Sequence, residues 1–129
     1  MNFINKCAEV YVPDKVDAKS ALARTTHLGI GAHQDDLESM AADGILQCFQ
    51  RDDRWFCGVV VTNGSGSPRA GIYKDYSNAE MQRVRRTEQI KAAILGEYGA
   101  QVLLDYPSAV VKDGHNTAPT ADILTVLKA

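Results

Sequence analysis

One short segment carries the residues whose types and spacing could do chemistry. Residues 32–38 read Ala-His-Gln-Asp-Asp-Leu-Glu, which places an imidazole beside two adjacent carboxylates. Imidazole nitrogens and carboxylate oxygens are ligands that Zn²⁺ and similar divalent ions take in proteins. Because two residues separate His33 from Asp36, a turn can aim both side chains at one ion. Asp35 would then be free to accept a proton from a water that the ion activates.

A simpler interpretation of the same residues is a helix cap. Aspartates at the start of a helix commonly accept hydrogen bonds from its free amide groups, so His33 and the two aspartates could serve that purpose alone. Their position directly after a predicted strand favours a site instead. Two protein ligands are too few for a catalytic zinc, which commonly takes three. The metal hypothesis therefore requires a third ligand from elsewhere.

The elements around this segment alternate between strands and helices. Apolar, β-branched or alternating runs predict strands at 27–31, 55–62 and 102–104, with a further short strand at 10–12. Helical spacing of apolar residues predicts a helix after Asp36 as far as Phe49, a second from Ser77 to Gly96 or Gly99, and a third over 120–129 with Pro119 in its first turn. Ser77 and Glu80 match a capping box at the start of the second helix.

This order predicts an α/β protein. We expect a Rossmann-like three-layer sandwich with a mainly parallel sheet and helices on both faces. Ligands of such sheets bind beyond the carboxyl ends of the strands. The segments 32–36, 62–71 and 105–108 are therefore the expected working surface. The glycine-rich segment 63–71 lacks the Gly-Lys-Ser/Thr sequence of a phosphate-binding loop, which argues against a nucleotide-binding domain.

Composition limits the remaining classes. The chain has 129 residues, of which 45% are hydrophobic and 23% charged, with a formal net charge of −2. These values suit a single globular domain and exclude a disordered chain or a basic nucleic-acid-binding surface. No apolar run is long enough for a membrane span, and the first residues do not form a signal peptide. The odd number of cysteines, three, fits free thiols in a cytoplasmic protein.

Four segments in order resemble the PIG-L/LmbE-like deacetylase family. The segment 32–38 is similar to the family's His-x-Asp-Asp motif, and 59–64 to the end of its second strand. Residues 85–88, Arg-Arg-Thr-Glu, resemble its Arg-x-x-Glu helix, and 104–107 the loop after its third strand. The resemblance implies a metal-dependent deacetylase that uses Zn²⁺ or another divalent metal. It also implies metal ligation by His33 and Asp36, a general base at Asp35, and substrate binding by Arg85, which Glu88 orients.

The chain also departs from the family pattern. Gln34 stands where the family usually has proline, and Ser108 where an aspartate is common. The third metal ligand of the family is a histidine from a later segment. His115 lies too early to match it, although a loop that folds back could bring His115 to the site. We therefore expect residues 1–129 to be the N-terminal portion of a longer deacetylase domain, with the third metal ligand beyond residue 129.

These observations together predict the function. We expect a hydrolase that removes the N-acetyl group from an N-acetylglucosamine-containing small molecule or glycoconjugate. The alternative is a non-catalytic α/β sugar-binding module, or a fragment with an incomplete metal site. The expected partner is an amino-sugar substrate rather than nucleic acid or a membrane. An incomplete sheet would expose apolar surface, so a homo-oligomer is also possible.

Overall fold

Four strands form one sheet in the computed structural model, which describes residues 1–129. The strands are β1 (Glu9–Tyr11), β2 (His27–Gly31), β3 (Phe56–Thr62) and β4 (Ala100–Tyr106), in the spatial order β1-β4-β3-β2. The helices are α1 (Ala18–Ala23), α2 (Asp36–Met40), α3 (Ala42–Cys48), α4 (Asn78–Leu95), α5 (Ser108–Lys112) and α6 (Ala118–Leu127), with a short 3₁₀ turn, η1, at Gly71–Tyr73.

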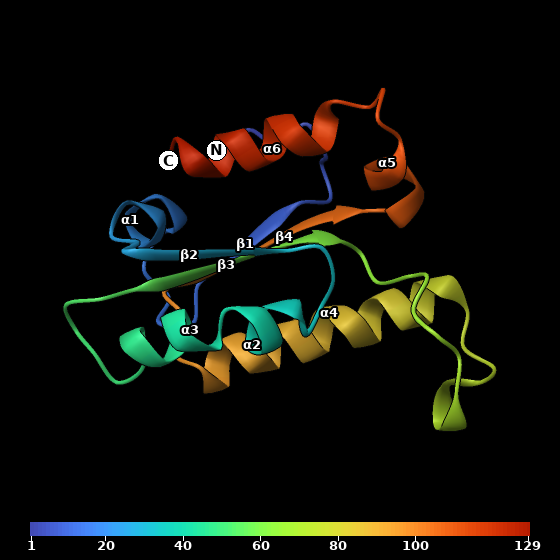
Figure 1. Ribbon diagram of the computed structural model, residues 1–129, viewed down its shortest axis with the longest axis horizontal. Coiled ribbons are helices and arrows are strands. Elements are labelled where there is room, and N and C mark those ends of the chain that lie inside the picture. The colour runs from blue at the N-terminus through green and yellow to red at the C-terminus, as the bar shows by residue number, and fades with distance from the viewer.

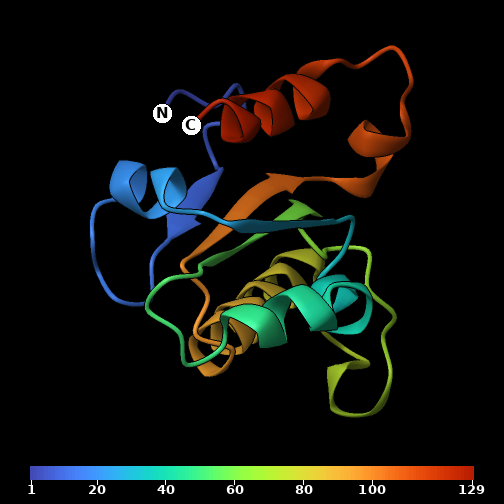
Figure 2. The same cartoon turned by 60° about the vertical axis from the view of Figure 1, so that its left-hand side comes forward.

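The helices lie in two layers, one on each face of the sheet. Helices α1, α5 and α6 cover one face, and α2, α3 and α4 cover the other (Figure 1). Turning the molecule shows the α2–α3 pair beside α4 and the two termini close together at one end (Figure 2). The expected three-layer α/β arrangement is therefore present.

The prediction of a mainly parallel sheet is wrong, because the sheet is mixed. Strands β2, β3 and β4 pair in parallel, whereas β1 pairs antiparallel with β4 and places Val10 opposite Val102. The sequence predicted no helix between the strands at 10–12 and 27–31, so the alternation that implies parallel pairing applied only from His27 onward. The direction of β1 is set by its docking on the outer edge of β4, and its three residues carry no signal of that direction.

Strand β3 forms the centre of the core. All seven of its residues are buried, as its continuous apolar run predicts. Cys57, Val59 and Val61 pack under α1 and α6, while Phe56 and Val60 pack under α2, α3 and α4. This alternation lets one strand hold both helical layers in place. The end of β3 at Thr62 therefore has a fixed position, and the segment that follows it starts from a rigid support.

Helix boundaries agree with the sequence in some places and differ in others. The capping box at Ser77 is present with both of its hydrogen bonds, and α4 ends at Leu95 with the predicted Gly96 as its C-cap. The single helix predicted after Asp36 is instead two helices, α2 and α3. They meet at Ala41, whose φ of −114° and ψ of 17° are not those of an α-helix. Helices α1 and α5 were not predicted. No helix is both long enough and apolar enough to cross a membrane.

A buried carboxylate ties the start of the chain to α6. Asp122 is fully buried and accepts hydrogen bonds from the backbone N–H groups of Ile4 (2.7 Å) and Asn5 (3.1 Å) and from the hydroxyl of Tyr106 (2.6 Å). Burial alone would raise the pKa of Asp122. The hydrogen bonds from Tyr106, Ile4 and Asn5 outweigh burial and hold this pKa below its ordinary value.

We expect Asp122→Ala to lower the free energy of unfolding by about 3 kcal/mol at neutral pH, because it leaves three donors without their acceptor. The lowered pKa favours the ionised form in the folded protein. The contribution of the charge is therefore complete above the unfolded pKa of about 3.9 and is lost as pH falls through the folded value. Urea unfolding of wild type, Asp122→Ala and the exposed control Asp75→Ala, from pH 7 to pH 3, measures this. A pH-independent gap between wild type and Asp122→Ala would contradict the assignment.

Candidate active site

The three predicted segments meet at one edge of the sheet. Beyond the carboxyl ends of β2, β3 and β4 lies a hollow of about 500 Å³ without apolar lining residues. His33 comes from the turn after β2, and Ser108 from the start of α5. The segment after β3 contributes Gly64, Gly66, Ser67 and Pro68. Arg85 and Lys112 complete its lining together with these residues. The three segments predicted to form the working surface therefore line one hollow.

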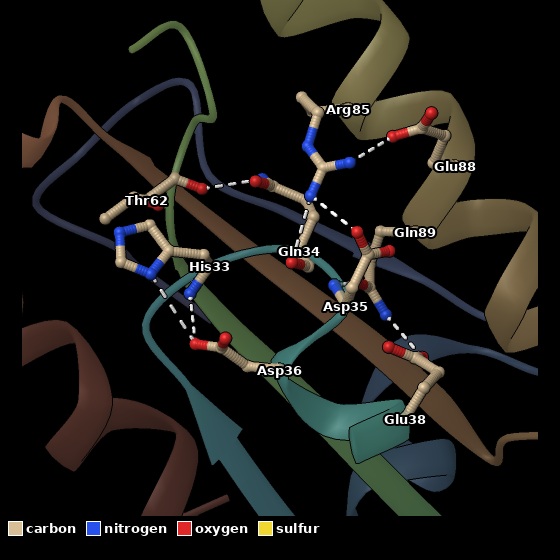
Figure 3. A network of polar contacts seen from close by, with 9 residues as sticks. All are labelled: His33, Gln34, Asp35, Asp36, Glu38, Thr62, Arg85, Glu88 and Gln89. Atoms are coloured by element: carbon tan, nitrogen blue, oxygen red, sulfur yellow. Dashed lines mark hydrogen bonds and ion pairs between the residues drawn. The ribbon is translucent and has the colours of Figure 1, made fainter. Parts of the chain in front are cut away.

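The turn from β2 into α2 directs its side chains to different sides (Figure 3). His33 and Asp36 face one another, with 3.6 Å between His33 Nδ1 and Asp36 Oδ2. The backbone N–H of His33 also donates to Asp36 Oδ2 at 2.8 Å, which fixes the turn between them. The side chains of His33 and Asp36 are 57% and 29% exposed. Both can therefore be reached by a ligand from solution.

Gln34 holds this turn against the neighbouring strand. Its side chain is 4% exposed, and its Nε2 donates to the carbonyl oxygen of Thr62 at 2.8 Å. The backbone N–H of Thr62 donates to Ala32 O at 2.9 Å, so two hydrogen bonds join the ends of β2 and β3. The sequence treated Gln34 only as a departure from the family's proline. In the structure it supplies an anchor that proline could not make, because proline has no side-chain donor.

Asp35 does not act as a helix cap. It lies at the N-cap position of α2 with a left-handed backbone (φ 72°), and its side chain makes no capping hydrogen bond. Its Oδ2 instead accepts a hydrogen bond from a terminal nitrogen of Arg85 at 2.8 Å, across 50 residues of sequence. The carboxylate is 65% exposed. The helix-cap interpretation therefore fails for Asp35, which is left available to a substrate.

Arg85 is the most buried charge of the cluster, with 17% of its side chain exposed. It donates to Asp35, to the carbonyl oxygen of Gln34 at 3.0 Å and to Glu88. Burial disfavours its charge, but the hydrogen bonds and attraction of Asp35 and Glu88 raise the pKa of Arg85 above its ordinary value. The structure thus places the guanidinium group of Arg85 between the carboxylates of Asp35 and Glu88, and both ion pairs hold it in position.

Sequence reasoning missed a buried glutamine behind Asp35. Gln89 is completely buried, and its Oε1 accepts the backbone N–H of Asp35 at 3.2 Å. Its Nε2 donates to Glu38 at 3.0 Å, and the hydroxyl of Tyr98 donates to the same oxygen of Glu38 at 2.7 Å. This chain of contacts supports the left-handed backbone of Asp35, which is uncommon for a residue with a side chain. The sequence could have revealed this contact, because Gln89 is a polar residue on the face of the predicted helix that its apolar residues bury.

Gly64 lets the segment after β3 approach the cluster closely. Its φ is +72°, and an added Cβ would lie 2.7 Å from both Arg85 Cβ and Gln34 Oε1. A side chain at this position would therefore displace Arg85 or Gln34. Gly66 in the same hollow has no atom within 4 Å of an added Cβ. Close packing therefore requires glycine at position 64 but not at position 66, and the two positions can be compared as a matched pair.

We expect Gly64→Ala to lower the free energy of unfolding by about 1–3 kcal/mol, because it combines a strained backbone with steric overlap. Gly66→Ala is expected to change it by less than about 0.5 kcal/mol. Thermal unfolding followed by circular dichroism compares the two variants. Equal stability of Gly64→Ala and Gly66→Ala would show that the close approach to Arg85 is absent.

His33 and Asp36 fit two positions around a divalent ion. Two ligands at about 2.1 Å from a tetrahedral ion lie about 3.4 Å apart, close to the separation of the facing nitrogen and oxygen here. No group of three or more His, Cys, Asp or Glu side chains in the chain is arranged to hold a metal ion. His115 lies in the exposed loop between α5 and α6 and does not line the hollow. The chain therefore offers two ligands at this position, and the structure does not bring in His115 as a third.

The hollow is lined by the imidazole of His33 and the guanidinium group of Arg85, and it lies at the carboxyl ends of parallel strands, where α/β proteins commonly bind their ligands. The sequence matches the PIG-L family, described as GlcNAc-PI de-N-acetylase, over residues 28–129, and the chain belongs to this family. The resemblance found in the sequence is thereby confirmed. Searches of curated proteins and of solved structures gave no match. Family membership points to a deacetylase of substrates that contain N-acetylglucosamine.

Proposed function

We propose that this protein is a metal-dependent hydrolase that removes the N-acetyl group from an N-acetylglucosamine-containing small molecule or glycoconjugate. One observation carries the proposal beyond family membership. The exposed carboxylate of Asp35 is held at 2.8 Å by Arg85, and Arg85 lines the same hollow as His33, whose imidazole faces Asp36. One proposed metal ligand, His33, thus lines a space that a sugar can enter, and the proposed proton acceptor, Asp35, is joined to that space through Arg85.

His33 and Asp36 would hold the metal ion, Zn²⁺ or another divalent metal. When bound, such an ion polarises the amide carbonyl and lowers the pKa of the attacking water. The chain contributes the fixed spacing of the two ligands, because the backbone hydrogen bond from His33 to Asp36 sets the turn. We infer that the third ligand belongs to a part of the domain after residue 129.

Asp35 would act as the general base. Its carboxylate accepts a proton from water as the oxygen attacks the acetyl carbon, and the carbon–nitrogen bond then breaks to give acetate and the sugar amine. The proton held by Asp35 is then available to the departing nitrogen. Arg85 keeps one oxygen of Asp35 in place at 2.8 Å and leaves the other free. Arg85 also lines the hollow and can bind a substrate oxygen there.

The domain that surrounds this site is proposed to be a longer Rossmann-like unit of a cytoplasmic protein, of which residues 1–129 form the N-terminal portion. Two observations support this extension. The parallel strands β2, β3 and β4 carry helices on both faces, and β2 pairs only with β3, so that its outer edge has no partner strand. A further strand on that edge would satisfy its backbone groups.

A non-catalytic sugar-binding module remains the second candidate function. The observation that favours it is the presence of only two metal ligands beside the hollow. In that case the polar hollow would bind the sugar without hydrolysing it.

Acetate release distinguishes these two functions. A protein that contains residues 1–129 together with the segment proposed to supply the third ligand is supplied with zinc and incubated with N-acetylglucosamine and with glycosides of N-acetylglucosamine, and both acetate and free amine are quantified. We expect equal amounts of the two products, and no release after chelation. Sugar binding by NMR without product would support the binding module and contradict the hydrolase. Neither binding nor product would contradict both.

A further inference from the structure

A groove between α3 and the end of α4 takes no part in the proposed reaction. It has a volume of about 480 Å³, and none of its lining residues lines the hollow at the carboxyl ends of the strands. Figure 2 shows α3 and α4 beside one another on the same face of the sheet. Seven of its nine lining residues are hydrophobic: Ala42, Ile45, Leu46, Phe49, Ala92, Leu95 and Tyr98. We call this space the apolar groove.

The apolar groove has a buried aromatic residue and exposed apolar side chains. Tyr98 is 3% exposed, and its ring meets that of Phe56 edge to face with 4.7 Å between the centroids. Leu46 and Leu95 are 70% and 78% exposed. A ligand that covers these leucines is favoured by the apolar surface that it removes from water. A concave and mainly apolar space of this volume is typical of a site for a small molecule.

Glu38 carries the only charge among the residues that line the apolar groove. Its Oε1 accepts hydrogen bonds from the hydroxyl of Tyr98 at 2.7 Å and from Nε2 of Gln89 at 3.0 Å, whereas its Oε2 is buried and has no hydrogen-bond partner. None of the ion pairs in the chain includes Glu38. A cation in the groove is therefore attracted to a carboxylate that no basic side chain neutralises.

The same carboxylate is connected to the turn that carries Asp35. Gln89 donates to Glu38 and accepts the backbone N–H of Asp35 at 3.2 Å, which supports the left-handed backbone of Asp35. A cation drawn to Glu38 competes with Gln89 for this carboxylate. The groove is thus linked to the turn at Asp35 through two side chains.

We propose that the apolar groove is a second ligand site, which binds a small hydrophobic amine. The apolar body of the ligand packs on Leu46, Phe49 and Leu95, and its ammonium group is directed toward Glu38. A sugar does not suit the groove, because its hydroxyl groups would lose water without gaining partners. Binding of the amine changes the contacts of Gln89 and, through them, the turn at Asp35. The inference does not depend on the proposed hydrolysis.

The test compares two probes with the same apolar body, 2-phenylethylamine and the neutral 2-phenylethanol. Their dissociation constants are measured by NMR titration of wild type, Glu38→Gln and Asp43→Asn. Glutamine keeps an acceptor for Tyr98 and Gln89 but removes the charge. Asp43 is an exposed aspartate on α3 that does not line the groove, so Asp43→Asn is the matched control. We expect the amine to bind about tenfold tighter than the alcohol to wild type and to Asp43→Asn, and equally with the alcohol to Glu38→Gln.

A second pair of variants tests the apolar wall. Leu95→Ala is expected to weaken binding of both probes about threefold, because it removes apolar contact area. Ile94 precedes Leu95 on α4, is 48% exposed and does not line the groove, so Ile94→Ala is expected to leave both constants unchanged. In wild type the backbone amide signal of Asp35 is expected to shift with the same saturation curve as the signals of the groove.

Four results would overturn the proposal. These are no binding of either probe, equal binding of amine and alcohol to wild type, a preference for the amine that survives Glu38→Gln, and an Asp35 signal that does not move. Groove signals that change on dilution without any probe would also contradict it, because they would show that a second copy of the protein covers the groove.

Discussion

Asp35→Asn is expected to lower kcat for acetate release by about 10²- to 10⁴-fold, the usual contribution of a general base. Asparagine has nearly the same shape and can still accept the hydrogen bond from Arg85, but it does not take up a proton at neutral pH. The substitution therefore removes the proton acceptor and keeps the hydrogen bond to Arg85. Because the substrate still finds the same hollow, we expect KM to stay within about twofold.

Steady-state kinetics on an N-acetylglucosamine glycoside measure both constants. Asp52→Asn serves as the control, since Asp52 is an exposed aspartate in the turn before β3 and lies outside the hollow. Thermal unfolding of each variant checks that the fold is intact. If Asp35→Asn kept kcat close to that of Asp52→Asn, the general base would have to be another residue.

Arg85→Met is expected to lower kcat/KM by about 10- to 100-fold, the value of one charge-assisted hydrogen bond or slightly more. Methionine retains apolar volume but removes the donors that hold Asp35, Gln34 and Glu88. Asp35 would then lose its fixed orientation, and the hollow would lose a cation. Arg85→Lys is expected to recover only part of the loss, because an ammonium group cannot make the same forked contacts.

The neighbouring Arg86 provides the matched control. Its side chain is 52% exposed and pairs with Glu9, away from the hollow. We expect Arg86→Met to keep kcat/KM within about twofold of wild type, since exposed ion pairs contribute little. Equal kinetic losses in Arg85→Met and Arg86→Met would contradict the role of Arg85 in holding Asp35.

Local sequence signals predicted the parts of the fold that depend on local physics. The capping box of Ser77 and Glu80 satisfies amide groups within one turn, so it could be recognised without knowledge of the rest of the fold. The buried strand β3 was equally clear, because seven consecutive residues that are buried on both faces must be largely apolar. The convergence of three segments at one edge of the sheet followed from the order of the elements.

Contacts between distant segments could not be predicted in this way. The pairing of Asp35 with Arg85 depends on how α4 packs beside α2, and the buried position of Gln89 depends on the same packing. The antiparallel direction of β1 is set by β4, which lies about ninety residues later in the sequence. Each of these features is a tertiary effect, and a single sequence without a structure carries no direct signal of it.

The most direct test of the central claim is a zinc titration of the protein that contains residues 1–129 together with the segment proposed to supply the third ligand. Binding by His33 and Asp36 is the part of the account on which the chemistry of Asp35 depends. Isothermal titration calorimetry of metal-free wild type, His33→Ala and Asp36→Ala measures it, with His115→Ala and Asp53→Ala as controls for an exposed histidine and an exposed aspartate. We predict one zinc site in wild type and both controls, and its loss in His33→Ala and Asp36→Ala. Unchanged zinc binding in His33→Ala and Asp36→Ala would contradict the account.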